Sequence, residues 1–556
     1  MPSWREWGAR FADLSTRVGV LARVANQTGL MWEITRPGLS VMKTVFTPSA
    51  KNPALIYRMH AVNAPNKVAL RFRDLSYTFA ELDEQIDRVA AGLRGHGVRR
   101  GSKLIVMLKN RPEFLLLQCG SSRAGCSAVS VSWRSTPAEL AYLAQNSGAK
   151  VIAVERELVA IAEQATRELP GVTIVTVGGE APGHVDFESL LTPGPIEPDS
   201  DPGALEDAAV VIYTSGTTGK PKGAVRKFPA EALPAALQFI AETPMRSDDV
   251  HLVACPLYHS TAFGFITLSH LLGCTVVIAD EFKPESFLRD VERHGVTTTA
   301  VVPTMLHRVL ALPKDVLHRY RTRSLRILFV GGAPLPAPLG TAAMDHFGDI
   351  LFNFYGATET GLVTLGKPED LRAAPGSIGR VVPGNEVRLL DDRGRDVPRG
   401  EVGELYVRSK ALVAGYHKDD AATRESMRDG FFSVGDLARQ DRDGRYFIEG
   451  RKRDMIISGG VNVYPAEVEA ALEAHPGLVE VAVVGVQDPE WGERVRAFVV
   501  KHADADVDEV ELKSWARGRL AGPKVPRDFV FLDALPRNPT GKVLKRELRG
   551  ASVTDS

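Results

Sequence analysis

The chain has 556 residues, 44% of them hydrophobic, and is long enough to form two or more domains with substantial cores. Lys plus Arg equals Asp plus Glu, at 68 each, so no overall charge favours nucleic acid or an acidic partner. The four cysteines lack metal-site spacing, and no apolar run is long enough to span a membrane. We therefore expect a cytoplasmic protein without nucleic-acid partners, a disulfide scaffold or a membrane span.

An amphipathic helix is expected near the N-terminus, where the first residues are unlike a secretory signal. Its apolar side chains recur every three or four positions with arginines between them: Trp4, Trp7, Phe11, Leu14, Val18 and Leu21. Such a helix suits an anionic membrane surface, which residues 3–25 would contact peripherally. It equally suits packing on the main domain or on a partner subunit, as in a homodimer. The pattern leaves these alternatives open.

From residue 61 the chain alternates between strand-like and helix-like segments. Residues 68–72 have the composition of a strand, and Thr78-Phe79-Ala80-Glu81 has the form of a capping box that opens a helix. Further strands are expected at 103–108, 128–132 and 151–154, and further helices at 112–125 and 137–147. This alternation predicts a parallel sheet covered by helices on both faces. Residues 182–203, rich in Pro, Asp and Gly, are expected to form a loop.

The next segment is an apolar run at residues 208–213, which indicates a buried strand. It opens into Thr214-Ser215-Gly216-Thr217-Thr218-Gly219-Lys220-Pro221-Lys222-Gly223. Glycines allow backbone N–H groups to approach an oxygen-rich ligand, the hydroxyls donate hydrogen bonds, and the lysines balance negative charge. The spacing is not that of a Walker A loop. A turn without function remains an alternative for this composition alone.

Strands expected at 250–255, 275–279, 297–302, 325–330 and 351–354 follow. Three of them lead into Pro256-Leu257-Tyr258-His259, Gly331-Gly332-Ala333-Pro334 and Tyr355-Gly356-Ala357-Thr358-Glu359. Ligands of α/β proteins bind where such strands end, so these loops predict one shared site. Short alternating strands beyond Gly376 predict a small β subdomain, and an α/β pattern restarts after residue 450.

The ordered string at 213–223 resembles the phosphate loop of the adenylate-forming superfamily, which includes acyl-CoA synthetases, peptide-synthetase adenylation domains and luciferases. Further motifs of that superfamily follow in the right order, so the resemblance runs from about Val68 to Leu548. It implies an α/β fold with a large N-terminal domain of helix-covered parallel sheets, a small β subdomain and a small mobile C-terminal α/β domain. We expect a helix and linker at 1–60, the adenylation domain at 61–450 and the mobile domain at 451–556.

The resemblance implies a binding site for ATP and AMP. Tyr355 would stack on adenine, and Asp436 of Ser433-Val434-Gly435-Asp436 would accept hydrogen bonds from the ribose, although the family usually has Thr at Val434. Arg451 would be a second ribose contact. The full nucleotide set is Thr214, Ser215, Gly216, Thr217, Thr218, Gly219, Lys220, Gly332, Ala333, Pro334, Tyr355, Gly356, Asp436 and Arg451.

By the same resemblance, Thr358 touches the phosphates and Glu359 binds Mg²⁺, in keeping with the preference of that ion for carboxylates. Lys542, in Pro536-Arg537-Asn538-Pro539-Thr540-Gly541-Lys542, would bridge the substrate carboxylate and the α-phosphate of ATP. Arg453 occupies the hinge position, where the family commonly has Asp or Lys. Gly459 and Gly460 would line the channel for coenzyme A.

The substrate is expected to be a small-molecule carboxylic acid. His259 would position its carboxylate or gate its pocket, although a lone His is more often a core residue. Four small or flexible residues expected around the pocket leave room for an apolar tail, namely Ser260, Ala262, Gly264 and Gly361, and Phe263 is expected to line the same pocket. The texture resembles bacterial medium- and long-chain fatty acyl-CoA ligases. The alternatives are a bulky cyclic or aromatic acid, transfer to a carrier protein, and a non-catalytic nucleotide-binding protein.

Overall fold

The computed structural model describes residues 23–24, 26–29, 54–192, 209–214, 222–227, 232–409, 415–416, 419–459, 461–502, 504–537 and 543–550. Several predicted features lie outside these residues: the apolar face from Trp4 to Leu21, the loop residues Ser215, Gly216, Thr217, Thr218, Gly219 and Lys220, and Gly460 and Lys542. Those predictions stay predictions. No helix of the described part is long and apolar enough to cross a membrane.

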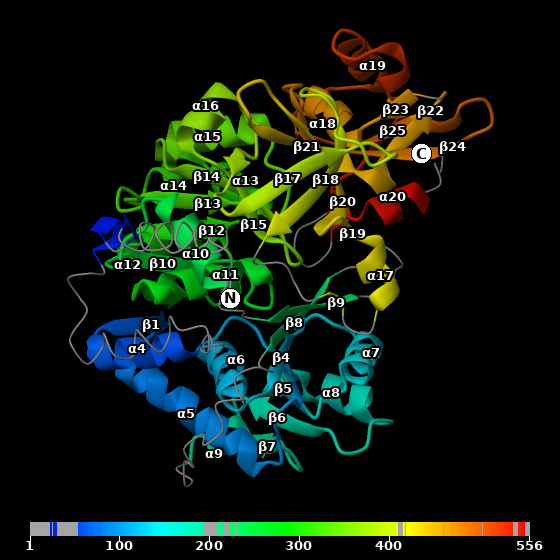
Figure 1. Ribbon diagram of the computed structural model, residues 1–556. Helices are drawn as coiled ribbons and strands as arrows, with labels where there is room; N and C mark the ends of the chain where they lie inside the picture. Colours follow the sequence, from blue (N-terminus) through cyan, green and yellow to red (C-terminus); the bar gives the residue numbers. More distant parts are fainter. Residues whose placement is uncertain are drawn as a thin grey trace, which may run out of the picture.

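Two large sheets form the body of the protein (Figure 1). The first has the order β7-β6-β5-β3-β4-β8-β9, in which only β9 runs antiparallel to its neighbour. Its strands are β3 (Lys103–Met107), β4 (Ser127–Ser130), β5 (Val151–Glu155), β6 (Thr173–Val177), β7 (Val185–Asp186), β8 (Ala209–Thr214) and β9 (Lys222–Lys227). The helices of this part are α4 (Leu55–Asn63), α5 (Phe79–Gly95), α6 (Pro112–Arg123), α7 (Pro137–Ser147), α8 (Val159–Thr166) and α9 (Phe187–Leu190).

The second sheet has the order β16-β15-β14-β13-β12-β10-β11-β1-β2, with a parallel centre from β14 to β1. Its strands are β1 (Val68–Phe72), β2 (Leu75–Thr78), β10 (Val250–Val253), β11 (Thr275–Ile278), β12 (Thr298–Val301), β13 (Ile327–Val330), β14 (Leu351–Ala357), β15 (Gly361–Gly366) and β16 (Arg380–Val381). Its helices are α10 (Ala232–Ala241), α11 (Ser260–Leu271), α12 (Pro284–His294), α13 (Pro303–Leu310), α14 (Lys314–Leu317), α15 (Ala337–Phe347) and α16 (Pro368–Ala373).

The largest hydrophobic core joins these two sheets. It includes Leu104 of the first sheet and Val276 of the second, together with Phe114 of α6 and Phe265 of α11, which lies between the sheets in Figure 1. Each of these side chains is at most 2% exposed. Burial of one such side chain contributes about 1.5–3 kcal/mol, so this core fixes the second sheet on the first.

A β subdomain and a C-terminal domain complete the fold. The subdomain sheet contains β17 (Asn385–Leu390), β18 (Gly403–Ser409), β19 (Met427–Arg428), β20 (Phe431–Gln440) and β21 (Tyr446–Arg451), with α17 (Asp420–Glu425). The C-terminal part, coloured orange to red in Figure 1, contains β22 (Ile456–Ser458), β23 (Val461–Val463), α18 (Pro465–Glu473), β24 (Leu478–Asp488), β25 (Gly492–Lys501), α19 (Glu509–Arg517), β26 (Asp528–Phe531) and α20 (Lys545–Gly550).

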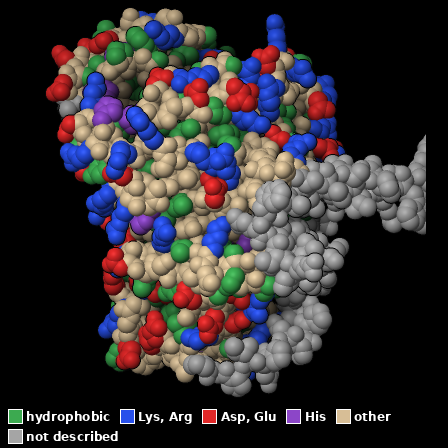
Figure 2. All heavy atoms as spheres, turned by 90° about the vertical axis from the view of Figure 1, so that its left-hand side faces the viewer, with side chains coloured by type: hydrophobic (Ala, Val, Ile, Leu, Met, Phe, Trp, Pro, Cys, Tyr) green, Lys and Arg blue, Asp and Glu red, His purple; other side chains and the backbone are tan. Residues whose placement is uncertain are grey.

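The predicted fold class is therefore confirmed, with two local corrections. The loop expected at 182–203 contains β7 and α9 before residue 193. The strand expected to end at Phe354 continues through Ala357 and pairs with β15 as an antiparallel hairpin. Acidic and basic side chains are interspersed over the face shown in Figure 2, in keeping with the balanced charge.

Candidate active site

One large cavity of about 3040 Å³ is lined by residues of both large sheets, the β subdomain and the C-terminal domain. The strands β10, β12, β13 and β14 are parallel neighbours, so their carboxyl ends meet at one edge of the sheet. The residues at these ends border the cavity: Ala254, Cys255, Val302, Gly332 and Tyr355. The three loops that the sequence analysis assigned to one shared site thus all border this cavity.

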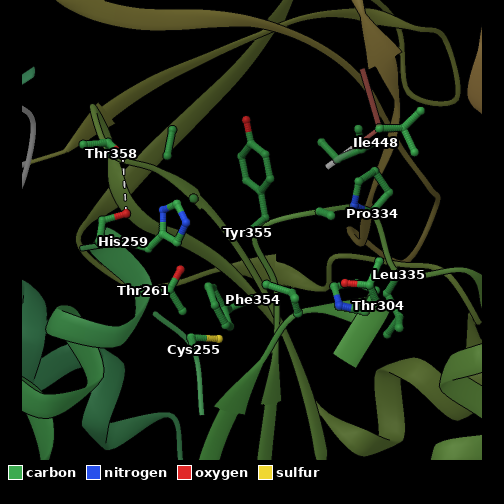
Figure 3. A pocket seen from close by; sticks show the side chains of 18 of the residues that line it. Cys255, His259, Thr261, Thr304, Pro334, Leu335, Phe354, Tyr355, Thr358 and Ile448 are labelled. Carbon is green, nitrogen blue, oxygen red and sulfur yellow. Dashed lines mark hydrogen bonds between the residues drawn. The ribbon is translucent and has the colours of Figure 1, made fainter. Parts of the chain in front are cut away.

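The β14–β15 hairpin carries Tyr355 into the cavity (Figure 3), and Glu359 of the same hairpin also borders it. Gly356 is required there, because a Cβ atom at this position would lie 2.1 Å from the carbonyl oxygen of Gly361 on the paired strand. The Ala357 N–H donates to Thr360 Oγ1 at 3.1 Å and closes the turn. The motif is therefore a rigid hairpin rather than a loose loop.

Asp436 lies in β20 opposite this hairpin and is only 8% exposed. The Tyr355 hydroxyl donates to Asp436 Oδ2 at 2.8 Å, and Arg451 Nε donates to Asp436 Oδ1 at 3.1 Å. Burial and the neighbouring Asp436 carboxylate raise the pKa of Tyr355 well above its ordinary value, so the hydroxyl stays protonated and donates. Three of the predicted nucleotide residues are thus joined in one hydrogen-bonded group.

The start of α11 forms the opposite wall of the cavity. His259 is the residue that precedes the helix, and burial lowers its pKa to about 4, so the imidazole is neutral at neutral pH. Its Nε2 is buried and has no hydrogen-bond partner within the described residues. Ser260 Oγ lies 3.3 Å from Thr358 Oγ1, which ties α11 to the β14–β15 turn (Figure 3).

The remaining predicted residues divide between the cavity and other places. Those that border it are Ser260, Phe263, Gly264, Gly332, Ala333, Pro334, Gly361 and Arg453. Ala262 does not border it, because it faces the opposite side of α11 and is buried in the main core at 3% exposure. Gly459 also lies away from it, in the turn after β22, where a Cβ atom would meet the Trp491 ring at 2.4 Å.

The phosphate-loop motif lies between β8 and β9, which pair as antiparallel neighbours from Ala209 and Lys227 to Thr214 and Lys222. Tyr213, the first residue of the 213–223 string, borders the cavity and donates from its hydroxyl to Asn146 Oδ1 at 2.6 Å. Arg537 and Lys545, on either side of Lys542 in the chain, border the cavity too.

Comparison with known proteins identifies the family. A family model described as "AMP-binding enzyme" matches residues 57–417. The chain belongs to the AMP-binding enzyme family. A second model, "AMP-binding enzyme C-terminal domain", matches residues 467–542, so this family relationship confirms the resemblance to the adenylate-forming superfamily.

Three relatives of this AMP-binding enzyme are informative. A feruloyl-CoA synthase of Amycolatopsis sp is 38% identical over 87% of this chain and 96% of its own. An indoleacetate–CoA ligase of Aromatoleum aromaticum is 34% identical over 88% of this chain and 96% of its own. The crystal structure of the anthranilate CoA ligase AuaEII in complex with anthranoyl-AMP has a TM-score of 0.84 at 27% identity, covering 91% and 98% of the two chains.

AMP-binding enzymes use ATP together with Mg²⁺, and Glu359 is suited to bind that ion. Within the described residues no three His, Cys, Asp or Glu side chains gather into a metal site. Glu359 is a single carboxylate at 6% exposure. Mg²⁺ beside ATP is typically held by one or two carboxylates, with phosphate oxygens and waters completing its shell. The single carboxylate of Glu359 at the cavity wall is therefore enough as the protein's ligand to Mg²⁺.

Tyr416 is a site residue that sequence reasoning missed. Its hydroxyl donates to Glu359 Oε1 at 3.1 Å, and its ring lies 6.0 Å from that of Phe432 in β20. Burial and the Glu359 carboxylate raise the pKa of Tyr416, which keeps the hydroxyl protonated as a donor. Nothing local in Gly415-Tyr416 indicates this contact, because Glu359 is 57 residues away in the chain.

Proposed function

We propose that this AMP-binding enzyme is a CoA ligase for an aromatic carboxylic acid. It is an AMP-forming acid–thiol ligase that uses ATP with Mg²⁺ and coenzyme A. The observation that supports an aromatic substrate is the set of relatives named for feruloyl-CoA, indoleacetate and anthranilate, which match almost the whole chain. These relatives favour the aromatic alternative over the medium- or long-chain fatty acid that the sequence texture predicted.

The cavity floor also favours a compact acid. Phe265 of α11, together with Phe239 and Phe354, borders the cavity, and the three side chains are at most 6% exposed. The Phe265 ring lies 4.6 Å from that of Phe329 and 5.3 Å from that of Phe354, measured between centroids. A long acyl chain would have to displace these packed rings, whereas a flat aromatic acid can lie against them with favourable ring contacts.

The chemistry begins with the acid and ATP. A carboxylate oxygen bonds to the α-phosphorus, pyrophosphate leaves, and acyl-AMP forms. In this proposal Asp436 and Arg451 hold the ribose and Tyr355 contacts the adenine. The Nε2 of neutral His259, which has no partner among the residues that the structure describes, hydrogen-bonds an oxygen of the acid. Lys542 offsets the negative charge that accumulates on the phosphoryl oxygens, and Glu359 would hold a Mg²⁺ ion that, when bound, would supply further charge compensation.

The second step forms the thioester. The CoA sulfur bonds to the acyl carbon, AMP leaves, and the thiol proton is released. The residues that flank Lys542 border the cavity, whereas Gly459 of the expected CoA channel does not. The arrangement described here therefore suits the first step. We propose that rotation of the C-terminal domain at Arg453 brings Gly459 and Gly460 to the site for the second.

The proposal is tested by measuring pyrophosphate release and then CoA-dependent AMP release with ferulate, indoleacetate, benzoate, decanoate and palmitate. We expect both signals with at least one aromatic acid. Pyrophosphate release that never becomes CoA-dependent would indicate a carrier protein as the acyl acceptor. Silence with every acid would indicate a non-catalytic nucleotide-binding protein.

Gly264 provides a test of the pocket map. It lies on α11 at the cavity wall, with open space where a side chain would point. Gly264→Leu is expected to lower kcat/KM for ferulate by about 10- to 100-fold, because the new side chain occupies the space of the ring. Benzoate, which is smaller, should lose less, and the KM for ATP should not change.

Gly95→Leu is the matched control. Gly95 is also a helical glycine with open space beside it, at the end of α5, and it does not border the cavity. This control should leave all kinetic constants unchanged. Equal losses for ferulate and benzoate in Gly264→Leu would contradict the assignment of this wall to the acid.

A further inference from the structure

Three glutamates of the C-terminal domain border the cavity next to the ends of the segment that contains Lys542. Glu469 and Glu473 are four residues apart on α18 and therefore lie on one side of that helix, and Glu480 lies on the neighbouring strand β24. Lys542 is five residues after Arg537 and three before Lys545 in the chain.

Two of these carboxylates hold the two ends of that segment. Glu480 Oε1 accepts a hydrogen bond from Arg537 Nη2 at 2.6 Å, and Glu469 Oε1 accepts one from Lys545 Nζ at 2.6 Å. The same Glu469 oxygen accepts the Val483 N–H at 2.7 Å, which fixes the carboxylate against β24.

The ends of the segment are also joined to each other. Arg537 and Val543 form an antiparallel β-bridge, and the Leu544 N–H donates to the Pro536 carbonyl at 2.8 Å. Both ion pairs are shielded, since the four charged side chains are between 19% and 27% exposed. Such pairs are stronger than pairs in open solvent, and loss of one partner leaves the other charge poorly compensated.

We propose that Glu469 and Glu480 are positioning residues for acyl-adenylate formation, because they hold Lys545 and Arg537, the described residues that flank Lys542 in the chain. This inference rests on the role of Lys542 in the proposed function and adds the residues that set its position. Because Lys542 serves only the first half-reaction, loss of either ion pair slows acyl-AMP formation and leaves thioester formation from acyl-AMP unaffected. A purely structural role would affect both halves.

Glu473 makes this arrangement sensitive to pH. The charged groups acting on it are Glu469 of its own helix, Glu480 of β24, and Lys545 and Arg537 at the ends of the Lys542 segment. Burial and then the two carboxylates raise the pKa of Glu473 to about 8. Below that pH the group is neutral, and two carboxylates balance two cations.

Above that pH, Glu473 ionises and competes with Glu469 and Glu480 for the same two cations. Acyl-adenylate formation is therefore expected to decline as the pH rises from about 7 to 9, while the neutral variant Glu473→Gln loses this decline. If acyl-adenylate formation declines with rising pH in Glu473→Gln as it does in the wild type, Glu473 is not the group responsible.

The deciding experiment compares the two half-reactions in the full-length enzyme, with the acid that the wild type activates fastest. Adenylation is followed by pyrophosphate exchange, and thioester formation by adding CoA to chemically prepared acyl-AMP. Glu480→Gln and Arg537→Gln are expected to slow adenylation about tenfold or more, since small misplacements of a catalytic group have large effects. Thioester formation should stay at the wild-type rate, and Arg537→Lys should recover much of the loss.

Glu467→Gln is the control. It removes the Glu467–Lys524 pair of 2.7 Å on the same helix, which does not involve the Lys542 segment, and both half-reactions should be unchanged. Equal losses in both half-reactions of Glu480→Gln, or unchanged adenylation, would overturn the proposal. If Glu480→Gln does not fold, the same comparison of adenylation rate with thioester-formation rate is made with Glu480→Asp. Failure of the aromatic assignment would appear separately, in the acid preference of the wild type.

Discussion

Lys542→Ala is expected to lower the rate of acyl-adenylate formation by about 100- to 1,000-fold while ATP still binds. The reason is electrostatic: negative charge spreads over the phosphoryl oxygens as pyrophosphate leaves, and no covalent group of the protein shares it. A cation placed at that point stabilises the transition state more than the bound substrates, so its removal affects the rate rather than the binding of ATP.

The measurement is pyrophosphate exchange for the rate and equilibrium dialysis for ATP binding. Lys513→Ala is the control, because Lys513 pairs with Glu509 on α19 at 2.7 Å and does not border the cavity. Thioester formation from prepared acyl-AMP should survive in Lys542→Ala. Near-normal adenylation in this variant would exclude Lys542 from the first step.

Asp436→Ala is expected to lower kcat/KM for ATP by about 100-fold, which corresponds to the loss of two hydrogen bonds to a charged acceptor. The same change leaves the Tyr355 hydroxyl and Arg451 Nε without their shared acceptor, 2.8 and 3.1 Å away. We therefore also expect the melting temperature to fall, by the equivalent of about 1–3 kcal/mol. The KM for the acid should change little, because Asp436 belongs to the nucleotide half of the site.

Asp396→Ala is the matched control for this effect. Asp396 pairs with Arg388 at 2.7 Å in the same β subdomain but is 62% exposed at its side chain and lies outside the cavity. It should alter neither the ATP kinetics nor the melting temperature appreciably. A normal KM for ATP in a folded Asp436→Ala enzyme would contradict the ribose assignment.

Elements with strong local patterns could be predicted closely from the sequence. The strand at 68–72 and the helix at 137–147 have the expected bounds, and Thr78 and Glu81 make the reciprocal capping box. These features depend on neighbours within four residues, which the sequence displays directly. The shared site was predictable for a related reason, since parallel strand ends must meet at one edge.

Features that depend on distant partners could not be predicted. Tyr416 contacts Glu359 and Arg537 contacts Glu480, each across 57 residues of chain, and neither pair follows a local pattern. The extension of β14 through Ala357 likewise requires β15 as a partner. Ala262 was wrongly assigned to the pocket because the helical face that α11 presents depends on how the helix packs.

The size of the acid pocket is another feature that depends on residues distant in the chain. Small residues on α11 suggested an open tunnel for an acyl tail, but the cavity is also bordered by Phe239 and Phe354 from two other elements and by Phe265 of α11 itself, whose ring lies 5.3 Å from that of Phe354. These rings come together only after the chain has folded. Substrate preference therefore followed from the relatives and the packing, and not from the motif.

The most direct test of the central claim is kcat/KM for CoA-dependent AMP formation, measured with ferulate and with decanoate in the same enzyme preparation. We expect ferulate to be the better substrate, because its ring fits against the packed aromatic side chains of the cavity and a flexible chain does not. A higher kcat/KM for decanoate would contradict the aromatic assignment and would favour the fatty acid instead.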